Sequence, residues 1–131
     1  MSISSAVIDV NHSVCDLSFL SGADAAGNTL PLSSLTATID DTTNAYIALN
    51  PASPSSSIYV VKRSTMAPGQ NLVVHVTFNG KSQDGTAVSP TVIPVSLQTP
   101  VPPQATQILV GSTSQGAGTF TDPASPTVTL I

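Results

Sequence analysis

The fold class of this chain is decided by the stretch Asn71–Phe78, which reads NLVVHVTF. Side chains of a β-strand point alternately to the two faces of their sheet. One face then carries Leu72, Val74, Val76 and Phe78, and the other carries Val73, His75 and Thr77. The stretch therefore predicts a strand whose first set of side chains lies in an apolar core, with His75 on the outer face. Asn79-Gly80 and Asp84-Gly85 follow and predict that the chain bends back after this strand.

The rest of the chain contains similar short runs, rich in β-branched residues and separated by Gly, Pro, Asn, Asp and Ser. No stretch keeps an apolar period of 3.6 residues, so we expect no long helix. We expect strands over Ala6–Asn11, Val14–Ser21, Ser34–Asp40, Ala45–Asn50, Ser57–Lys62, Asn71–Phe78 and Thr91–Gln98, and two more over Thr106–Gly111 and Thr127–Ile131. Many short strands with frequent turn signals are typical of an all-β sandwich.

Alternation also assigns core faces in the other strands. The residues expected to face inward are Cys15, Leu17, Phe19, Leu35, Ala37, Ile39, Ile58, Val60, Ile93, Val95 and Leu97. Pro94 then faces outward. Because proline cannot donate a hydrogen bond to a ladder, it predicts an edge strand or a bulge. Pro94 is therefore a candidate interface residue.

Composition limits the classes of partner. The chain has 131 residues, the size of one domain, and 40% of them are hydrophobic while only 8% are charged. The net charge is −4, with Lys62, Arg63 and Lys81 as the cations. Neutralising a phosphate backbone requires a stripe of several cations. We therefore expect neither nucleic acid nor a membrane as a partner.

The proline-rich run 99–104 divides the chain. We expect residues 1–98 to form the sandwich, 99–104 to be a stiff linker, and 105–131 to be a strand-bearing tail. The tail offers five candidate interface residues: Ile108, Leu109, Val110, Val128 and Leu130. Adjacent apolar residues point to opposite faces, so such a strand needs cover on both sides. The tail is expected either to pack on its own sandwich or to add a strand to a neighbouring subunit.

The first residues, MSISS, have neither a positive charge nor an apolar run, and Cys15 is the single cysteine of the chain. We therefore expect no secretory signal and no intrachain disulfide. Synthesis in a reducing cytoplasm, whatever the final destination, is the simplest expectation.

Three segments resemble bacterial-type immunoglobulin-like repeats. They are Leu20–Pro31 with its D-x-x-G-N turn, Ala37–Asp41 followed by Ala45–Leu49, and Ala67–Thr77. The resemblance covers roughly residues 14–110 and implies an immunoglobulin-like sandwich. Together with the strand pattern it predicts an immunoglobulin-like β-sandwich of about seven strands with a C-terminal two-strand extension. The chain lacks tryptophan and a cysteine pair, so antibody-type hallmarks are not expected. Similar small proteins are associated with bacteriophage and prophage structural genes.

Residues with reactive side chains are few. His12 and Cys15 are three apart, but Cys15 is expected in the core, where a thiol is unreactive. Asp40 and Asp41 are weak candidates for a calcium site, because oxygen ligands suit that ion. The run 111–118 is glycine-rich but lacks the lysine of a phosphate loop. We expect no catalytic, cofactor-binding or metal site, and Tyr46 and Tyr59 are the exposed aromatic candidates for sugar binding.

These features favour a non-enzymatic virion protein, such as an immunoglobulin-like module that decorates a phage capsid, tail or fibre. The expected partners are other virion proteins, such as the major capsid or tail proteins, and a homo-oligomer is an option. The alternatives are a bacterial surface adhesion or carbohydrate-binding module and a filament subunit that uses its tail as a donor strand.

Overall fold

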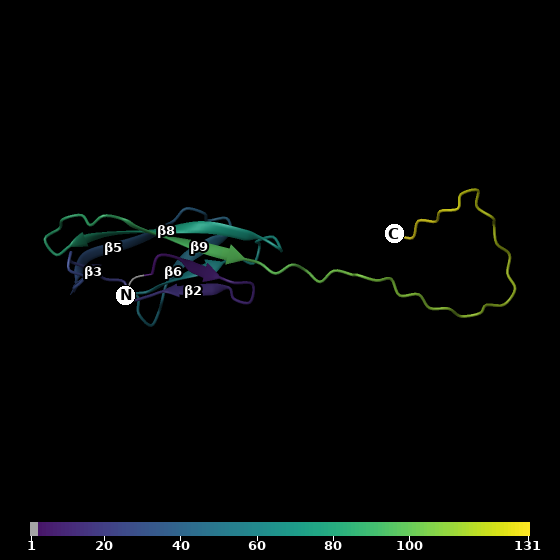
Figure 1. The fold of residues 1–131 in the computed structure, drawn as a ribbon, viewed down its shortest axis with the longest axis horizontal. Helices are drawn as coiled ribbons and strands as arrows, with labels where there is room; N and C mark the ends of the chain where they lie inside the picture. The colour runs from purple at the N-terminus through teal and green to yellow at the C-terminus, as the bar shows by residue number, and fades with distance from the viewer. Residues whose placement is uncertain (1–2) are drawn as a thin grey trace.

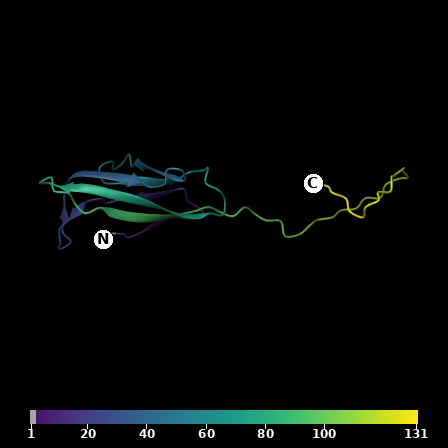
Figure 2. The ribbon, with the colours of Figure 1, turned by 90° about the horizontal axis from the view of Figure 1, so that it is seen from above.

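The computed structural model describes residues 3–131, and its strands lie between Ala6 and Gln98 (Figures 1 and 2). Within the described residues the body is all-β and has no helix, as the sequence predicts. Two sheets contribute side chains to one apolar core, so the body has a β-sandwich character. Residues 3–131 contain no helix of the length and hydrophobicity that a membrane crossing requires.

The strands assigned in residues 3–131 are β1 (Ala6–Ile8), β2 (Val14–Leu17), β3 (Gly22–Ala23), β4 (Thr29–Leu30), β5 (Leu32–Ile39), β6 (Ala45–Leu49), β7 (Ile58–Lys62), β8 (Asn71–Ser82) and β9 (Thr91–Gln98). The seven longer ones overlap the seven strands predicted up to Gln98. The short β3–β4 hairpin was not predicted as strand. Gly27, at its turn, has a φ of 86°, which glycine adopts without strain.

The strand order is β1-β9-β8-β5 in the first sheet and β2-β7-β6 in the second, and β3 and β4 form a separate two-stranded sheet. β1 runs parallel to β9, whereas the other neighbours are antiparallel. β8 and β9 pair from Asn71 opposite Gln98 to Phe78 opposite Thr91. Consequently β5 and β1 are the edge strands of the first sheet, and β2 and β6 those of the second.

The core lies between the two sheets. Its buried apolar residues are Ile8, Leu17, Ala45, Ile58, Val60, Met66, Val74, Val76, Phe78, Ile93, Val95 and Leu97. The inward faces predicted for β7, β8 and β9 are confirmed by this set, with Leu72 partly buried against it. Burying one such side chain contributes about 1.5–3 kcal/mol. The alternation of these strands is therefore the main source of the fold's stability.

The prediction that Phe19 faces the core is wrong. Its side chain is 92% exposed, and its φ of 57° interrupts the alternation that begins in β2. Because the left-handed conformation redirects the chain, the next residue, Leu20, packs against the core instead. A period of two holds only while the backbone remains extended.

The turn after β8 also differs from expectation. β8 continues through Asn79-Gly80 to Ser82, and the chain reverses at Gly85, whose φ is 85°. Gly80 lies where a Cβ would be 3.2 Å from the carbonyl oxygen of Ser34 in β5. Close backbone approach, not a turn, accounts for this glycine.

Pro94 does not mark an edge strand, because β9 lies between β1 and β8. However, β1 pairs with β9 only over Val95–Leu97, and Pro94 is opposite His75 on the β8 side. The described chain places no strand beside Pro94 on its other side. The missing proline N–H therefore breaks no ladder hydrogen bond there.

The expected two-strand extension is absent from the structure, which assigns no strand after Gln98. The chain leaves one end of the body and extends away from it in both views (Figures 1 and 2). Residues 100–131 are exposed. A strand requires hydrogen bonds from a partner, and the apolar runs at Ile108 and Val128 have none within the described chain.

Candidate interaction surface

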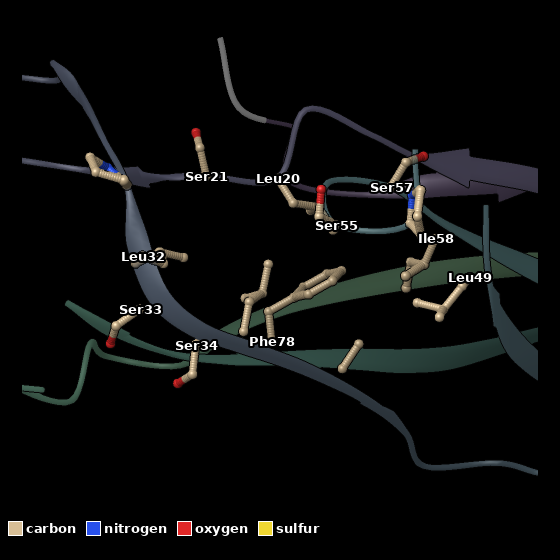
Figure 3. Close-up of a pocket in the computed structure, with 14 residues that line it drawn as sticks. Leu20, Ser21, Leu32, Ser33, Ser34, Leu49, Ser55, Ser57, Ile58 and Phe78 are labelled. Atoms are coloured by element: carbon tan, nitrogen blue, oxygen red, sulfur yellow. The ribbon is translucent and has the colours of Figure 1, made fainter. Parts of the chain in front are cut away.

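A cavity of about 400 Å³ opens between the two sheets beside β5 and β6. β5 contributes Leu32–Leu35 and Ala37 to its lining, while Leu49 ends β6 and Ile58 begins β7. In Figure 3 Leu32 and Phe78 point toward the middle of the cavity, whereas Ser33 and Ser34 point away. The cavity is thus an opening into the apolar core along one side of the body.

The lining contains no charged residue, and its polar members are serines. The lining therefore presents apolar groups and hydroxyl groups to whatever occupies it. It suits a neutral, largely apolar occupant that reaches a few hydroxyl groups at the rim.

The cavity is flanked by the free edges of β5 and β6. Neither strand contains a charged residue or a proline, as their sequences LSSLTATI and AYIAL show. Natural proteins usually protect exposed edges with such residues or with bulges. The register of β5 with β8 shifts between Leu32 and Ser34, which protects that end of the edge, whereas the pairing is regular from Ser34 to Ile39. These edges therefore offer backbone groups to another strand.

A polar network lies behind one lining residue of the cavity, Ser57. Ser57, which is 3% exposed, donates its hydroxyl to the carboxylate of Asp16 and accepts from Asn50 Nδ2 at 3.3 Å. Asn50 Oδ1 in turn accepts from the amide of Ala52 at 3.0 Å. Among the described residues, no histidine belongs to this network. Its polar groups form hydrogen bonds with one another, and the network therefore stabilises the β6–β7 connection.

The root of the tail is fixed to the body. Thr99 Oγ1 donates to the carbonyl of Ala67 at 2.6 Å and accepts from the amide of Gln70 at 2.8 Å. The amide of Gly69 donates to the carbonyl of Pro100 at 3.0 Å. These contacts hold the chain at the end of the body from which it departs.

Beyond this root the predicted interface residues are exposed apolar side chains. Ile108 is 90% exposed and Leu130 92%, and Leu109, Val110 and Val128 are exposed as well. Phe120, which was not predicted as an interface residue, is exposed by 88%. The structure brings none of these side chains to the cavity, and Pro94 lies apart from them on β9. Large exposed apolar groups close in sequence are typical of contact segments.

His12 and Cys15 do not form a pair. His12 Nδ1 lies 2.6 Å from Asp9 Oδ1, on the surface. Cys15 is half-buried and packs against the core, as predicted. Burial raises the pKa of its thiol, and the nearby Asp16 charge raises it further. The thiolate, which is the nucleophilic form, is therefore disfavoured.

Asp40 and Asp41 use their oxygens separately. Asp40 accepts from the His75 amide at 2.8 Å and lies 2.9 Å from His75 Nδ1. Asp41 accepts from the amides of Thr43 and Asn44 and from the side-chain amide of Asn44. Among residues 3–131 no three His, Cys, Asp or Glu side chains are grouped so as to hold a metal ion. These two carboxylates shape strand ends.

The surface carboxylates predict sensitivity to acid. Hydrogen bonds hold the pKa of five surface carboxyl groups below 3.8. Each carboxylate has one main donor residue: His12 for Asp9, Asn28 for Asp24, His75 for Asp40, Asn44 for Asp41 and Thr86 for Asp84. As the pH falls through 3.8 the unfolded chain therefore binds protons first, which favours unfolding. We expect Tm to fall from pH 5 to pH 3. Asp24→Asn should lessen this fall in calorimetry, whereas an equal fall would contradict the contribution of Asp24.

Two parts of this surface were missed by sequence reasoning. The cavity residues Leu20 and Leu49 come from different segments, and only the packing of the sheets brings them together. Lys62 donates through Nζ to the carbonyl oxygens of Asp9 and Gln98, at 3.0 and 2.6 Å. The one available signal was that Lys62 is a lone cation in an otherwise uncharged strand.

Comparison with known proteins identifies no relatives: no family model, no curated protein and no solved structure matches the chain. The candidate surface therefore rests on its own geometry.

Proposed function

We propose that this chain is a non-enzymatic structural protein that acts through protein–protein contacts, as an immunoglobulin-like module of a phage virion. The observation that carries the proposal is the contrast between a folded body and a tail of exposed apolar residues. Ile108 and Leu130, at either end of this tail, contact nothing in the body. Their exposure favours a role in which another protein covers them.

The strand order supports the immunoglobulin-like part of the proposal. A three-stranded sheet faces a four-stranded one, and β1 pairs in parallel with the last strand, β9. Sandwiches of this type divide about seven strands between two sheets and join them by Greek-key connections. Fold alone does not assign function, so the virion role rests on the tail and on the neutral surface.

The low charge of the surface supports an assembly role. Few ions must lose their hydration when such a surface is covered, and interface centres are depleted of charged residues. The tail 99–131 contains one charged residue, Asp122. A virion protein such as the major capsid or tail protein is the partner class that we propose.

The experiment is co-sedimentation of the purified chain with capsids and tails from the phage or prophage of its host. We expect saturable binding in near-stoichiometric amounts. A chain that ends at Gln104 is the matched variant and should lose most of this binding. Absence of saturable binding to every particle would overturn the proposal.

Removal of residues 105–131 should leave the stability of the body unchanged. These residues make hydrogen bonds only with one another in the structure, such as Thr127 N to Ser125 Oγ, while the root at Thr99 and Pro100 is retained. We expect the same circular dichroism spectrum and a Tm close to that of the full chain. A clear fall in Tm would instead show that the tail packs on its own sandwich.

Carbohydrate binding, as in a bacterial surface adhesion module, is the second candidate. Tyr46 is 40% exposed, but the Arg63 guanidinium lies 4.8 Å from its ring centre. A sugar that stacks on Tyr46 must displace Arg63. Glycan-array binding that Tyr46→Ala abolishes, without binding to particles, would favour this candidate.

A further inference from the structure

We propose that the segment Thr127–Ile131 of one copy adds a strand to the free edge of β5 in a second copy, with Val128 and Leu130 in the cavity. This inference rests on the proposed function and names a second copy of the chain as a partner. Strand addition joins main-chain hydrogen bonds to alternating side-chain pockets. Both components are present in the structure.

The alternation of the segment matches a one-sided site. In the sequence TVTLI, Val128 and Leu130 point to one face of a strand, while Thr127, Thr129 and the last residue, Ile131, point to the other. At the β5 edge the inward face meets the apolar cavity and the outward face meets water. The other apolar run, Ile108–Val110, has apolar residues on both faces and does not match such a site.

The cavity lining and the segment are both uncharged, since neither contains a charged residue. Leu35 and Leu49 offer apolar contact, and the edge that the new strand would follow is the part of β5 from Ser34 to Ile39, where the register with β8 is regular. No ion is then buried without a partner.

The direction of the tail favours a second copy over the chain's own body. The tail is pinned at Thr99 and Pro100, near the Asn71 end of β8, whereas the cavity lies at Phe78. The two ends are seven residues apart along β8, or roughly 23 Å. Pro100, Pro102 and Pro103 stiffen the departing chain, which runs away from the cavity in both views. In that direction the tail can meet a second copy of the chain.

Length permits the exchange. Residues 102–126 can span about 80 Å when extended, which is enough to reach either a second copy or the chain's own cavity, so the direction of departure and not the length favours a second copy. Reciprocal exchange between two copies closes a dimer, whereas one-way exchange builds a longer chain of subunits. Either outcome joins copies through the same contact.

The test is light scattering of the full-length protein across a range of concentrations. We expect masses at or above twice the 13.2 kDa of one chain. Leu130→Asp and Leu49→Asp should each weaken association about tenfold or more, because each places a charge in the contact. Ile108→Asp is the matched control, since Ile108 is equally exposed but lies outside the segment, and it should associate as the wild type does.

A mixture of the two variants provides a second measurement. Leu130→Asp retains an intact cavity and Leu49→Asp retains an intact tail. The mixture should therefore form a heterodimer, although each variant by itself associates only weakly. Hydrogen exchange should show protection of β5 amides in the wild type and its loss in Leu130→Asp. That variant cannot unfold the body, because Leu130 does not contact it.

Three results would overturn the inference: a monomer at every concentration, equal dissociation by Ile108→Asp, or β5 protection in a monomer, which would mean that the tail binds its own body. Binding to phage particles by a chain that does not self-associate would leave the proposed function standing. Self-association without binding to phage particles would support this inference and contradict the proposed function.

Discussion

Leu97→Ala is expected to lower the free energy of unfolding by about 3 kcal/mol, within the range of roughly 2–5 kcal/mol for leucine deletions in cores. Leu97 is fully buried and lies in β9 between Ile8 of β1 and Leu72 of β8. Its removal leaves a cavity at the point where the parallel and antiparallel pairings meet. The surrounding strands cannot collapse into this cavity without breaking their ladders.

Urea denaturation of the purified variant measures this loss directly. Val92→Ala is the control, because Val92 lies in the same strand but is 50% exposed. It should cost less than about 1 kcal/mol. Equal losses for the two variants would mean that β9 does not present Leu97 to the core.

Lys62→Met is expected to cost about 2 kcal/mol, because hydrogen bonds that involve a charged group contribute about 1.5–3 kcal/mol. The ammonium of Lys62 joins the end of β7 to the carbonyl of Asp9 after β1 and to that of Gln98 at the end of β9. Methionine keeps the length of the apolar stem but donates no hydrogen bond. The variant should therefore loosen the place where the tail leaves the body.

Lys81→Met removes the same charge from an exposed position of β8, and it should change stability by less than about 0.5 kcal/mol. The difference between the two variants in urea denaturation isolates the hydrogen bonds from the effect of net charge. The amide of Gly69 donates a hydrogen bond to the carbonyl of Pro100. Its rate of hydrogen exchange should rise in Lys62→Met but not in Lys81→Met. If both lysine variants lose the same stability, net charge and not the contact is responsible.

The tail shows why part of the fold was not predictable. The sequences of Ile108–Val110 and Thr127–Ile131 are typical of strands, yet neither segment forms a strand in the structure. Strand propensity mainly describes how a residue fits a half-buried pleated surface. A segment with this propensity forms a strand only where another chain segment supplies hydrogen bonds. A local sequence pattern does not contain that information.

The sequence by itself determined the all-β class and the approximate position of the seven longer strands. It also determined the inward faces of β7, β8 and β9, because side-chain alternation is local and needs no knowledge of the neighbours. The same alternation predicted that Cys15 packs against the core. Of the two turn signals after Phe78, Asp84-Gly85 lies at the reversal, whereas Asn79-Gly80 lies inside β8.

Only the tertiary structure decided how these strands pair. The parallel match of Ile8 with Leu97, the outward turn of Phe19, and the position of β9 inside its sheet depend on contacts between distant segments. The cavity beside β5 depends on the packing of two sheets that the alternation of each strand does not specify. Side-chain direction is set by the residue's own backbone, whereas pairing is set by whichever distant edge can satisfy that backbone's hydrogen bonds.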